Sequence, residues 1–250
     1  MDKETDIIFG KNPVLEAFNS GAEIEKIIVQ DTLRGETEKE IRALCQVNNI
    51  PLSKAPLERL NFLSRNQNHQ GVIAYLSPVE YQKLDDVLSM VYDKGLLPLI
   101  VVVEGISDVR NFAAIARSAF VFGAHALVTT SKNSARINEE AVKTSAGTLL
   151  KIPVCRERNM SEVLDTLHGY GIKIMATDLK SAVEIDDCDF AVGTAIILGS
   201  EGKGVIPETL RRSDIRIKIP HVENFDSLNV SVAAGIILYE VQRQRRNIKI

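Results

Sequence analysis

The chain has 250 residues, of which 45% are hydrophobic, 25% are charged and 5% are aromatic. This composition is typical of a globular protein, excludes a disordered chain, and allows one large or two modest domains. The net charge of −3 argues against a histone-like nucleic-acid binder that depends on charge alone, but it does not exclude RNA recognition by a local basic cleft.

Neither a metal nor a membrane is expected as a partner. Cys45, Cys155 and Cys188 are far apart and lack both CxxC spacing and neighbouring histidines, so we expect no disulfide framework and no metal site. The longest apolar runs, LLPLIVVV and AAGIILY, are too short to cross a bilayer, and the first residues are charged. We therefore expect a cytoplasmic protein.

Apolar runs rich in β-branched residues alternate with helical patterns, which predicts an α/β architecture. In the first part of the chain, strands are expected at 26–30 and 71–76, and helices over NPVLEAFNS and GETEKEIRALCQVNN. In the first of these helices we expect Pro13 at the first helical position behind Asn12 as the cap. Residues 79–96 follow a proline and carry a short amphipathic pattern, which is typical of a connection between domains.

Residues 97–250 are expected to form a second domain around a parallel sheet. This part begins with PLIVVVEG, a continuous apolar run typical of a strand buried on both faces. Ligands of open parallel sheets bind beyond the carboxyl ends of the strands, so the segments that follow the strands are the candidate site. Later strands are expected at 126–130, 172–177, 194–199 and 215–220, and helices near 111–122, 138–146, 160–169 and 228–245.

The first candidate segment is EGISDVRNFAAIARSA. Asp108 is placed to cap a helix that carries Asn111 and Arg117. These two residues are six apart, so they do not stack on one face of the helix, although both can reach the rim of a cleft. Taken alone, the segment is explained by an ordinary capped helix with a solvated Arg117.

The second candidate segment is ILGSEGKGVIP, in which three glycines surround Glu201. Such glycines indicate positive φ angles or close approach by another group. The spacing fails the P-loop pattern, because Val205 and Ile206 stand where Lys-Ser/Thr is required. It also fails the Rossmann pattern, because Pro207 replaces the last glycine. A tight turn between a strand and a helix is the alternative interpretation.

The third candidate segment is HVENFDSLNVSVAAGIILYE. Its polar head leads into a helix that is apolar nearly all round, which predicts burial against more than one neighbour, inside the fold or at a subunit interface. A helix cap needs only one side-chain oxygen, from Ser227 or Asn229. Further polar groups at a buried helix start are costly unless something satisfies them.

In this order and spacing, NFAAIARSA, ILGSEGKG and IPHVENFDSLNVSVAAGIILYE resemble the three motifs of the SpoU or TrmH family of RNA ribose 2′-O-methyltransferases, in the SPOUT superfamily. The front part, with FGKNPVLEAF and NHQGVIAYL, resembles the L30e-like RNA-binding domain of the family's 23S rRNA guanosine members. The resemblance covers the whole chain. The first motif departs from the family pattern at Val109 and Ala113, where many members have proline and glycine.

The resemblance implies a small L30e-like α/β domain at 1–78, a linker at 79–96, and a catalytic domain at 97–250 with a parallel sheet and a C-terminal trefoil knot. It also implies a homodimer through the knotted face. Knots are rare in proteins, and nothing in composition or periodicity indicates one.

The resemblance further implies a cofactor, a reaction centre and an RNA surface. S-adenosylmethionine would bind at Leu198, Gly199, Glu201, Gly202, Ile219, Leu228, Asn229 and Ser231. The reaction centre would comprise Asn111, Arg117, Glu201, Ser227 and Asn229. RNA would meet Arg110, Arg117, Arg136 and Lys203.

The reaction would transfer a methyl group to a ribose 2′-hydroxyl, so catalysis would depend on positioning and on a route for the hydroxyl proton. Family models give that proton to the arginine, here Arg117, but a guanidinium with a pKa above about 12 stays protonated. We therefore expect Arg117 to clamp a phosphate and the developing oxyanion, while Glu201, Ser227 and Asn229 hold the pocket in register.

Alternatives remain at three levels. The front domain favours 23S rRNA as substrate, and a tRNA guanosine in the D-loop is the nearest alternative; no DNA partner is expected. A catalytically silent RNA-binding protein and a different nucleotide-binding α/β enzyme are the rivals from other classes. His69 is expected to be structural, with RNA contact as the alternative, His221 is a weak candidate base, and RQRR at 243–246 is expected to be a solvated helix end.

Overall fold

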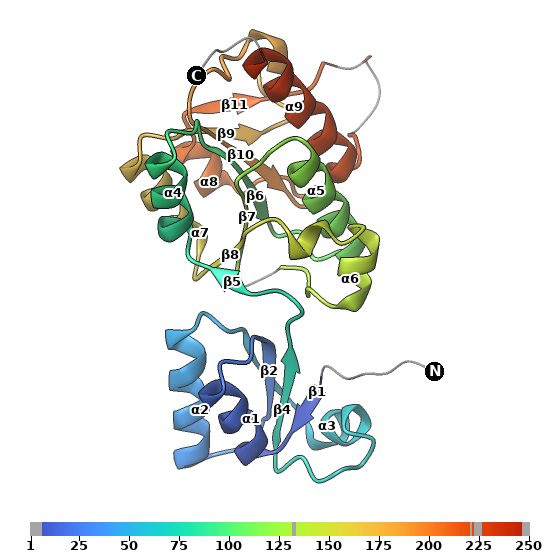
Figure 1. Ribbon diagram of the computed structural model, residues 1–250. Coiled ribbons are helices and arrows are strands. Elements are labelled where there is room, and N and C mark those ends of the chain that lie inside the picture. The colour runs from blue at the N-terminus through green and yellow to red at the C-terminus, as the bar shows by residue number, and fades with distance from the viewer. Residues whose placement is uncertain (1–6, 132–133, 221, 223–226, 247–250) are drawn as a thin grey trace. The chain divides into compact units, whose positions relative to one another are not determined.

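The structure is a computed structural model, and it describes residues 7–131, 134–220, 222 and 227–246. The chain divides into two compact units, Met1–Glu80 and Tyr81–Ile250. Both units are drawn in Figure 1, and each is described by itself.

The first unit is a four-stranded sheet with helices packed on it. Strand order is β1-β4-β2-β3, in which β4 is antiparallel to both of its neighbours and β2 and β3 are parallel. Its main core joins Val14 and Ile41 of two helices to Ile27 and Val72 of the sheet. The strands are β1 (Ile7–Phe9), β2 (Ile24–Gln30), β3 (Leu52–Ala55) and β4 (Val72–Leu76), and the helices are α1 (Lys11–Asn19), α2 (Glu36–Val47) and α3 (Leu57–Leu63).

Gly10, and not Asn12, is the N-cap residue of α1, so the predicted cap is wrong. The chain passes directly from β1 into α1 with Gly10 at φ 94°, a conformation that residues with a Cβ rarely adopt. The neighbouring turn also leaves little room, because a Cβ on Gly10 would lie 3.3 Å from Oε1 of Gln70.

The second unit contains a seven-stranded sheet of order β11-β9-β10-β6-β7-β8-β5, in which every neighbouring pair is parallel. The predicted parallel sheet is therefore confirmed. The strands are β5 (Tyr81–Gln82), β6 (Leu99–Glu104), β7 (Ala126–Thr130), β8 (Val154–Glu157), β9 (Lys173–Thr177), β10 (Thr194–Gly199) and β11 (Ile215–Ile217). The helices are α4 (Leu84–Asp93), α5 (Val109–Val121), α6 (Glu139–Thr144), α7 (Met160–Gly169), α8 (Pro207–Arg212) and α9 (Val230–Arg245), with short 3-10 turns at Thr148–Leu150 and Ile185–Asp187.

Helices cover both faces of this sheet. In Figure 1, α4, α7 and α8 lie on one side of it and α5, α6 and α9 on the other. Because both faces are covered, the central strands β6 and β10 are buried along their whole length. Among the described helices, none combines the length and the apolar character that crossing a membrane requires.

The stretch 79–96, expected as a linker, contributes to the second unit from Tyr81 onward. Strand β5 pairs with β8 at the edge of the sheet, and Leu84 and Leu88 of α4 are fully buried in its core. The Glu157 side chain accepts a hydrogen bond from the backbone N–H of Leu84 at 2.7 Å and so satisfies the start of α4. The amphipathic pattern marks a helix that packs on the sheet, and the units divide before it, after Glu80.

Helix α9 buries one side and leaves another exposed. Its inward side chains include Ala234, Ile237 and Leu238, while Val232 and Tyr239 are half exposed. The predicted burial all round is therefore only partly realised within one chain.

Arg245 anchors the end of α9, so the expectation of a solvated helix end is wrong for this residue. Its guanidinium donates to four backbone carbonyls, those of Phe190, Leu97, Pro98 and Val192, at 2.9, 3.1, 3.0 and 2.6 Å. Burial lowers the pKa of Arg245 to about 10, which still leaves it charged at neutral pH. The carbonyls belong to the segments that precede β6 and β10, so Arg245 ties α9 to the amino ends of both strands.

Replacing Arg245 by alanine is expected to lower the free energy of unfolding of the second unit by about 2–3 kcal/mol. The carbonyls of Phe190 and Leu97 lose the guanidinium as their donor, and those of Pro98 and Val192 keep only the hydrogen bonds from Thr194. Lysine is expected to restore less than half of this, since an ammonium has only three N–H donors and cannot satisfy all four carbonyls. Urea denaturation of the full chain measures the change. Arg246→Ala, at an exposed neighbouring position, is the matched control, and equal effects of Arg245→Ala and Arg246→Ala would contradict the anchoring role.

Candidate active site

The candidate site lies where β6 and β10 end side by side in the middle of the sheet. Their register pairs Glu104 with Gly199, the last residues of the two strands. Beyond them, a Cβ on Gly105 would lie 3.6 Å from the Cβ of Ser200, so the first two candidate segments leave the sheet in contact. From β6 the chain builds β7 and β8 on one side, and it later inserts β10 on the other side, which is the topology that binds ligands at such an edge.

The glycine-rich segment after β10 folds back on its own strand. The N–H of Gly204 donates to the carbonyl of Ser200 at 2.8 Å, and Gly202 and Gly204 have φ angles of 81° and 66°. A Cβ on Gly199 would lie 2.0 Å from the backbone carbon of Gly204, so no other residue fits there. The segment is a tight turn between strand and helix, and its tip carries Glu201.

Glu104 fixes the far side of this turn, and sequence reasoning gave it no role beyond ending a strand. Its buried carboxylate accepts hydrogen bonds from the N–H of Ile206 at 2.9 Å and from the hydroxyl of Thr209 at 2.7 Å. A carboxylate at the end of a fully apolar strand needs such partners, because an unpaired buried charge is costly. That cost was the available signal for a structural role.

The three candidate segments meet in one cluster of side chains, Asn111, Glu201 and Asn229. The Nδ2 groups of Asn111 and Asn229 both donate to Oε1 of Glu201, at 2.9 and 2.7 Å. Nδ2 of Asn229 also lies 3.0 Å from Oδ1 of Asn111. Residues up to 118 positions apart in the sequence thus surround one carboxylate.

Asn229 is at the same time the N-cap of α9. Its Oδ1 accepts hydrogen bonds from the backbone N–H of Ser231 at 2.9 Å and from the Ser231 hydroxyl at 2.6 Å. The amide oxygen caps the helix while the amide nitrogen faces Glu201. Of the two residues expected as the cap, Ser227 and Asn229, it is Asn229 that caps the helix, and the same side chain contacts Glu201.

The other two residues predicted for the reaction centre, Ser227 and Arg117, are described by the structure but make no hydrogen bond to this cluster within one chain. Ser227 is exposed and makes no hydrogen bond with the described residues, which do not include 223–226 or His221. Arg117 is exposed on α5 and likewise has no hydrogen bond or ion pair to the part of the chain that the structure describes. A separation of six residues places it about 240° around the helix from Asn111.

The other predicted positions lie around this edge of the sheet or on its helices. Asp108 caps α5, accepting from the N–H groups of Arg110 and Asn111 at 2.8 and 2.9 Å, as the plain interpretation of that segment predicted. The Arg110 side chain pairs with Glu140 at 3.7 Å. Leu198 is buried, Ile219 and Arg136 are half-buried, and Gly202, Lys203 and Leu228 are exposed.

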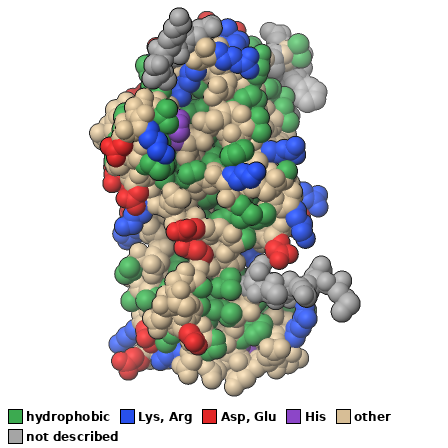
Figure 2. Space-filling model, in the orientation of Figure 1, with side chains coloured by type: hydrophobic (Ala, Val, Ile, Leu, Met, Phe, Trp, Pro, Cys, Tyr) green, Lys and Arg blue, Asp and Glu red, His purple; other side chains and the backbone are tan. Residues whose placement is uncertain are grey.

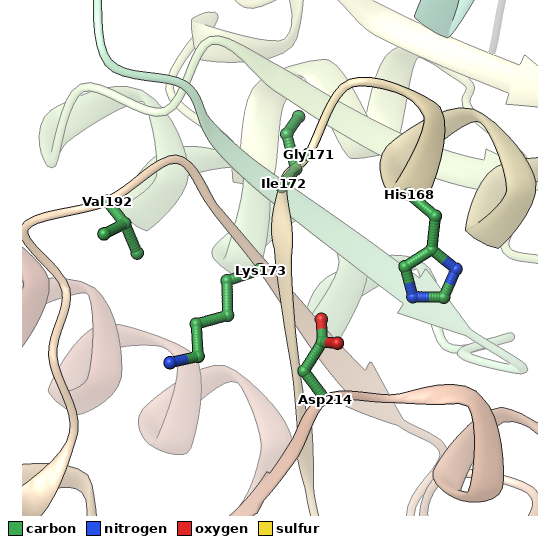
Figure 3. Close-up of a pocket in the computed structure, with 6 residues that line it drawn as sticks. All are labelled: His168, Gly171, Ile172, Lys173, Val192 and Asp214. Carbon is green, nitrogen blue, oxygen red and sulfur yellow. The ribbon is translucent and has the colours of Figure 1, made fainter.

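A separate hollow lies at the opposite edge of the sheet, where β9, β10 and β11 begin (Figure 3). Its lining includes Lys173, Asp214 and His168, and in that view Asp214 lies between the other two. One oxygen of Asp214 is occupied by the N–H of Ile174 at 2.7 Å. The hollow is therefore distinct from the cluster beyond the carboxyl ends of the strands.

Basic side chains form no single extended patch on the face drawn in Figure 2, where acidic and apolar groups are interspersed with them. The described residues also contain no group of three or more His, Cys, Asp and Glu side chains placed to hold a metal ion.

Comparison with known proteins gives the same identification for both units. The model of the SpoU rRNA Methylase family matches residues 98–239, and that of RNA 2′-O ribose methyltransferase substrate binding matches residues 7–82. The chain is 32% identical over 246 residues to a putative TrmH family tRNA/rRNA methyltransferase of Staphylococcus epidermidis, covering 98% of both chains.

Two solved structures are similar. The SpoU methyltransferase AviRb from Streptomyces viridochromogenes, solved with AdoMet, has a TM-score of 0.61 at 22% identity and covers 97% of this chain and 91% of its own. The TrmH/SpoU tRNA modifying enzyme of A. aeolicus has a TM-score of 0.55 at 31% identity and covers 64% of this chain and 85% of its own. The chain belongs to the SpoU family and is an S-adenosylmethionine-dependent RNA 2′-O-ribose methyltransferase.

Proposed function

We propose that the enzyme methylates the ribose 2′-hydroxyl of a guanosine in 23S rRNA, and that Asn111, Glu201 and Asn229 organise its reaction centre. The convergence of the two amides, Asn111 and Asn229, on the carboxylate of Glu201 carries the proposal. The front unit favours rRNA, because the similar tRNA modifying enzyme of A. aeolicus covers only 64% of this chain. A tRNA guanosine in the D-loop is the rival substrate.

The residues at the edge of the sheet fit S-adenosylmethionine. The turn after Gly199 presents backbone groups, which can bind an adenine edge and a ribose, and its tip carries the carboxylate of Glu201. A negative Glu201 suits a cationic ligand. The cofactor supplies a methyl group activated by a positively charged sulfur. In this proposal Leu198, Gly199, Glu201, Gly202, Ile219, Leu228, Asn229 and Ser231 hold it.

The chain's own contribution is positioning. Glu201 is held by two amide donors, so its orientation is set before substrate arrives, which lowers the reorganisation needed during the reaction. Ser227 stands beside Asn229 at the start of α9, where it can contact the ribose. Arg110, Arg136 and Lys203 are proposed to contact RNA phosphates, with Arg110 giving up its exposed pair with Glu140.

Arg117 is proposed to reach the reaction centre of a second copy in a homodimer. Within one chain it is exposed, lies about 240° around α5 from Asn111, and has no partner among the described residues. Helix α9 packs beside α5 and exposes Val232, Ile236 and Tyr239 as a stripe at helical spacing. A two-fold contact through this stripe buries apolar side chains and brings α5 of each copy near its partner. We also propose that the second unit contains the trefoil knot of the family and that the enzyme acts in the cytoplasm.

Ile236→Asp is expected to convert the dimer to monomers and to abolish methylation, because Arg117 then has no partner cluster to complete. Ile237 is not suitable for this test, since it is 1% exposed and a charge there would unfold its own chain. Analytical ultracentrifugation and a methylation assay measure both effects. Leu179→Asp, at an exposed position outside α9, is the control. A monomeric Ile236→Asp variant with full activity would contradict the proposal that Arg117 acts in the reaction centre of a second copy.

Two measurements test the function itself. Calorimetry with S-adenosylmethionine should show binding. A chain that binds no S-adenosylmethionine would contradict the proposed cofactor site. Mapping 2′-O-methyl groups in rRNA and tRNA from cells with and without this protein should show one guanosine of 23S rRNA that loses its methyl group. Loss of a tRNA methyl group instead would establish the rival substrate.

A further inference from the structure

We propose that Phe62 and Arg59 of α3 form a stacking platform for an unpaired RNA base, next to the loop 65–70 that contacts the same nucleotides. This inference rests on the proposed function, in which RNA is the substrate, and it specifies which surface of the front unit binds which kind of RNA. Phe62 is a large aromatic side chain on the last turn of a short helix, and 73% of it is exposed. The Arg59 guanidinium lies over its ring, 5.5 Å from the centroid.

The ring and the guanidinium together are suited to a flat aromatic ligand. Stacking on aromatic side chains and on arginine is how proteins bind unpaired bases, and it tolerates different bases because each has a π face. With so much of Phe62 exposed, a second planar group has access to its ring. A ring that is 73% exposed still has most of its apolar surface to bury against such a partner.

The loop after α3 has the chemistry that accompanies base stacking. Residues 65–68 are Arg, Asn, Gln and Asn, all exposed, and no acidic side chain occurs between residues 59 and 70. Amides offer both donors and acceptors to base edges and to the 2′-hydroxyl, while the arginines complement phosphate charge. An acidic protein partner would complement the positive charge, but the three neutral amides fit a nucleic-acid base and ribose better.

The loop is held rigidly beside Phe62. The N–H of Asn66 donates to the carbonyl of Asn61 at 2.8 Å, and the N–H of Arg65 donates to that of Phe62 at 3.3 Å, so the loop turns back on the end of α3. Buried His69 fastens its far end. The N–H of Gly71 donates to Nδ1 of His69 at 3.0 Å, so Nε2 carries the proton and donates to Oδ1 of Asn61 at 2.9 Å.

His69 is therefore structural, as expected from the sequence, and its role is to fix the amide loop against α3. A pre-formed loop loses little conformational entropy when it binds. This arrangement gives the NHQG segment a physical function in the front unit that does not require His69 itself to touch RNA.

The test uses the full chain and a single-stranded RNA oligonucleotide that carries one 2-aminopurine, with the same strand annealed to its complement as the comparison. Phe62→Ala is expected to weaken single-strand binding roughly 5- to 100-fold and to remove the fluorescence quenching that stacking causes. Phe62→Leu should fold equally well and also lose the quenching, because it keeps apolar area but has no ring. Binding of the duplex should change little.

Val47→Ala is the matched control, since Val47 lies on α2 of the same unit and is 81% exposed. In methylation assays, Phe62→Ala should raise KM for RNA and leave kcat and cofactor binding unchanged. If Phe62→Ala and Val47→Ala both methylate RNA with the same KM, the stacking platform is contradicted and the proposed function is not. A wild-type chain that binds S-adenosylmethionine but methylates no RNA would instead overturn the proposed function.

Discussion

Replacing Glu201 by alanine is expected to lower kcat for RNA methylation by roughly 10²- to 10³-fold, the magnitude seen when one preorganised polar group is removed from a reaction centre. Both amides that point at Oε1 lose their acceptor, so Asn111 and Asn229 are free to reorient. The cluster lies at the exposed edge of the sheet, so we expect thermal stability to change little. Single-turnover kinetics with saturating RNA and cofactor measure the effect on the chemical step.

Glu201→Gln separates geometry from charge. Glutamine keeps an oxygen that can accept from both amides but carries no negative charge. If charge next to a cationic methyl donor matters, Glu201→Gln falls close to Glu201→Ala; if only geometry matters, it stays close to the wild type. Glu208→Ala, an exposed acidic neighbour on α8, is the control. Wild-type kcat in Glu201→Ala would show that the cluster does not serve the reaction.

Gly199→Ala is expected to weaken S-adenosylmethionine binding by roughly 100-fold or more, because the new Cβ would lie 2.0 Å from the backbone carbon of Gly204 and would force the turn open. The turn cannot move away freely, since Glu104 holds Ile206 and Thr209 on its far side. Calorimetry measures the affinity, and hydrogen exchange of the turn reports its opening.

Gly169→Ala is the matched control for this substitution, because nothing lies within 4 Å of a Cβ there and its φ is not positive. In a helix, alanine at that position should be neutral or stabilising by up to about 1 kcal/mol. Cofactor affinity within about twofold of the wild type in Gly199→Ala would contradict the role assigned to the turn.

The central architecture could be predicted because the strands there are buried on both faces. Their apolar runs stand out in the sequence, and the bounds predicted for β7 and β10 agree with the structure. The short edge strands β1 and β5 have three and two residues, too few for any periodic pattern to show. The placement of α4 was also missed, because an amphipathic pattern shows that a helix buries one face but not which sheet it packs on.

In the candidate site, the local structure could be predicted from the sequence, but the contacts between distant residues could not. Glycine chemistry indicated that the turn after β10 is tight. Capping rules indicated that Asp108 begins one helix, and they left Ser227 and Asn229 as alternatives for another, which Asn229 caps. The meeting of Asn111, Glu201 and Asn229 came only from the family resemblance, because contacts between residues about 100 positions apart depend on strand order, which periodicity does not encode. Arg245 was misjudged for a related reason, since a basic helix end looks solvated until the carbonyls around it are known.

Helix α9 is fixed at both ends, by Asn229 beyond the carboxyl ends of the strands and by Arg245 at their amino ends. Its 16 residues span about 24 Å, close to the roughly 20 Å of a six-residue strand such as β10. One inserted or deleted residue would rotate one end by about 100° relative to the other and release either the cap or the anchor. Evolution should therefore have allowed this helix to change its side chains but not its length.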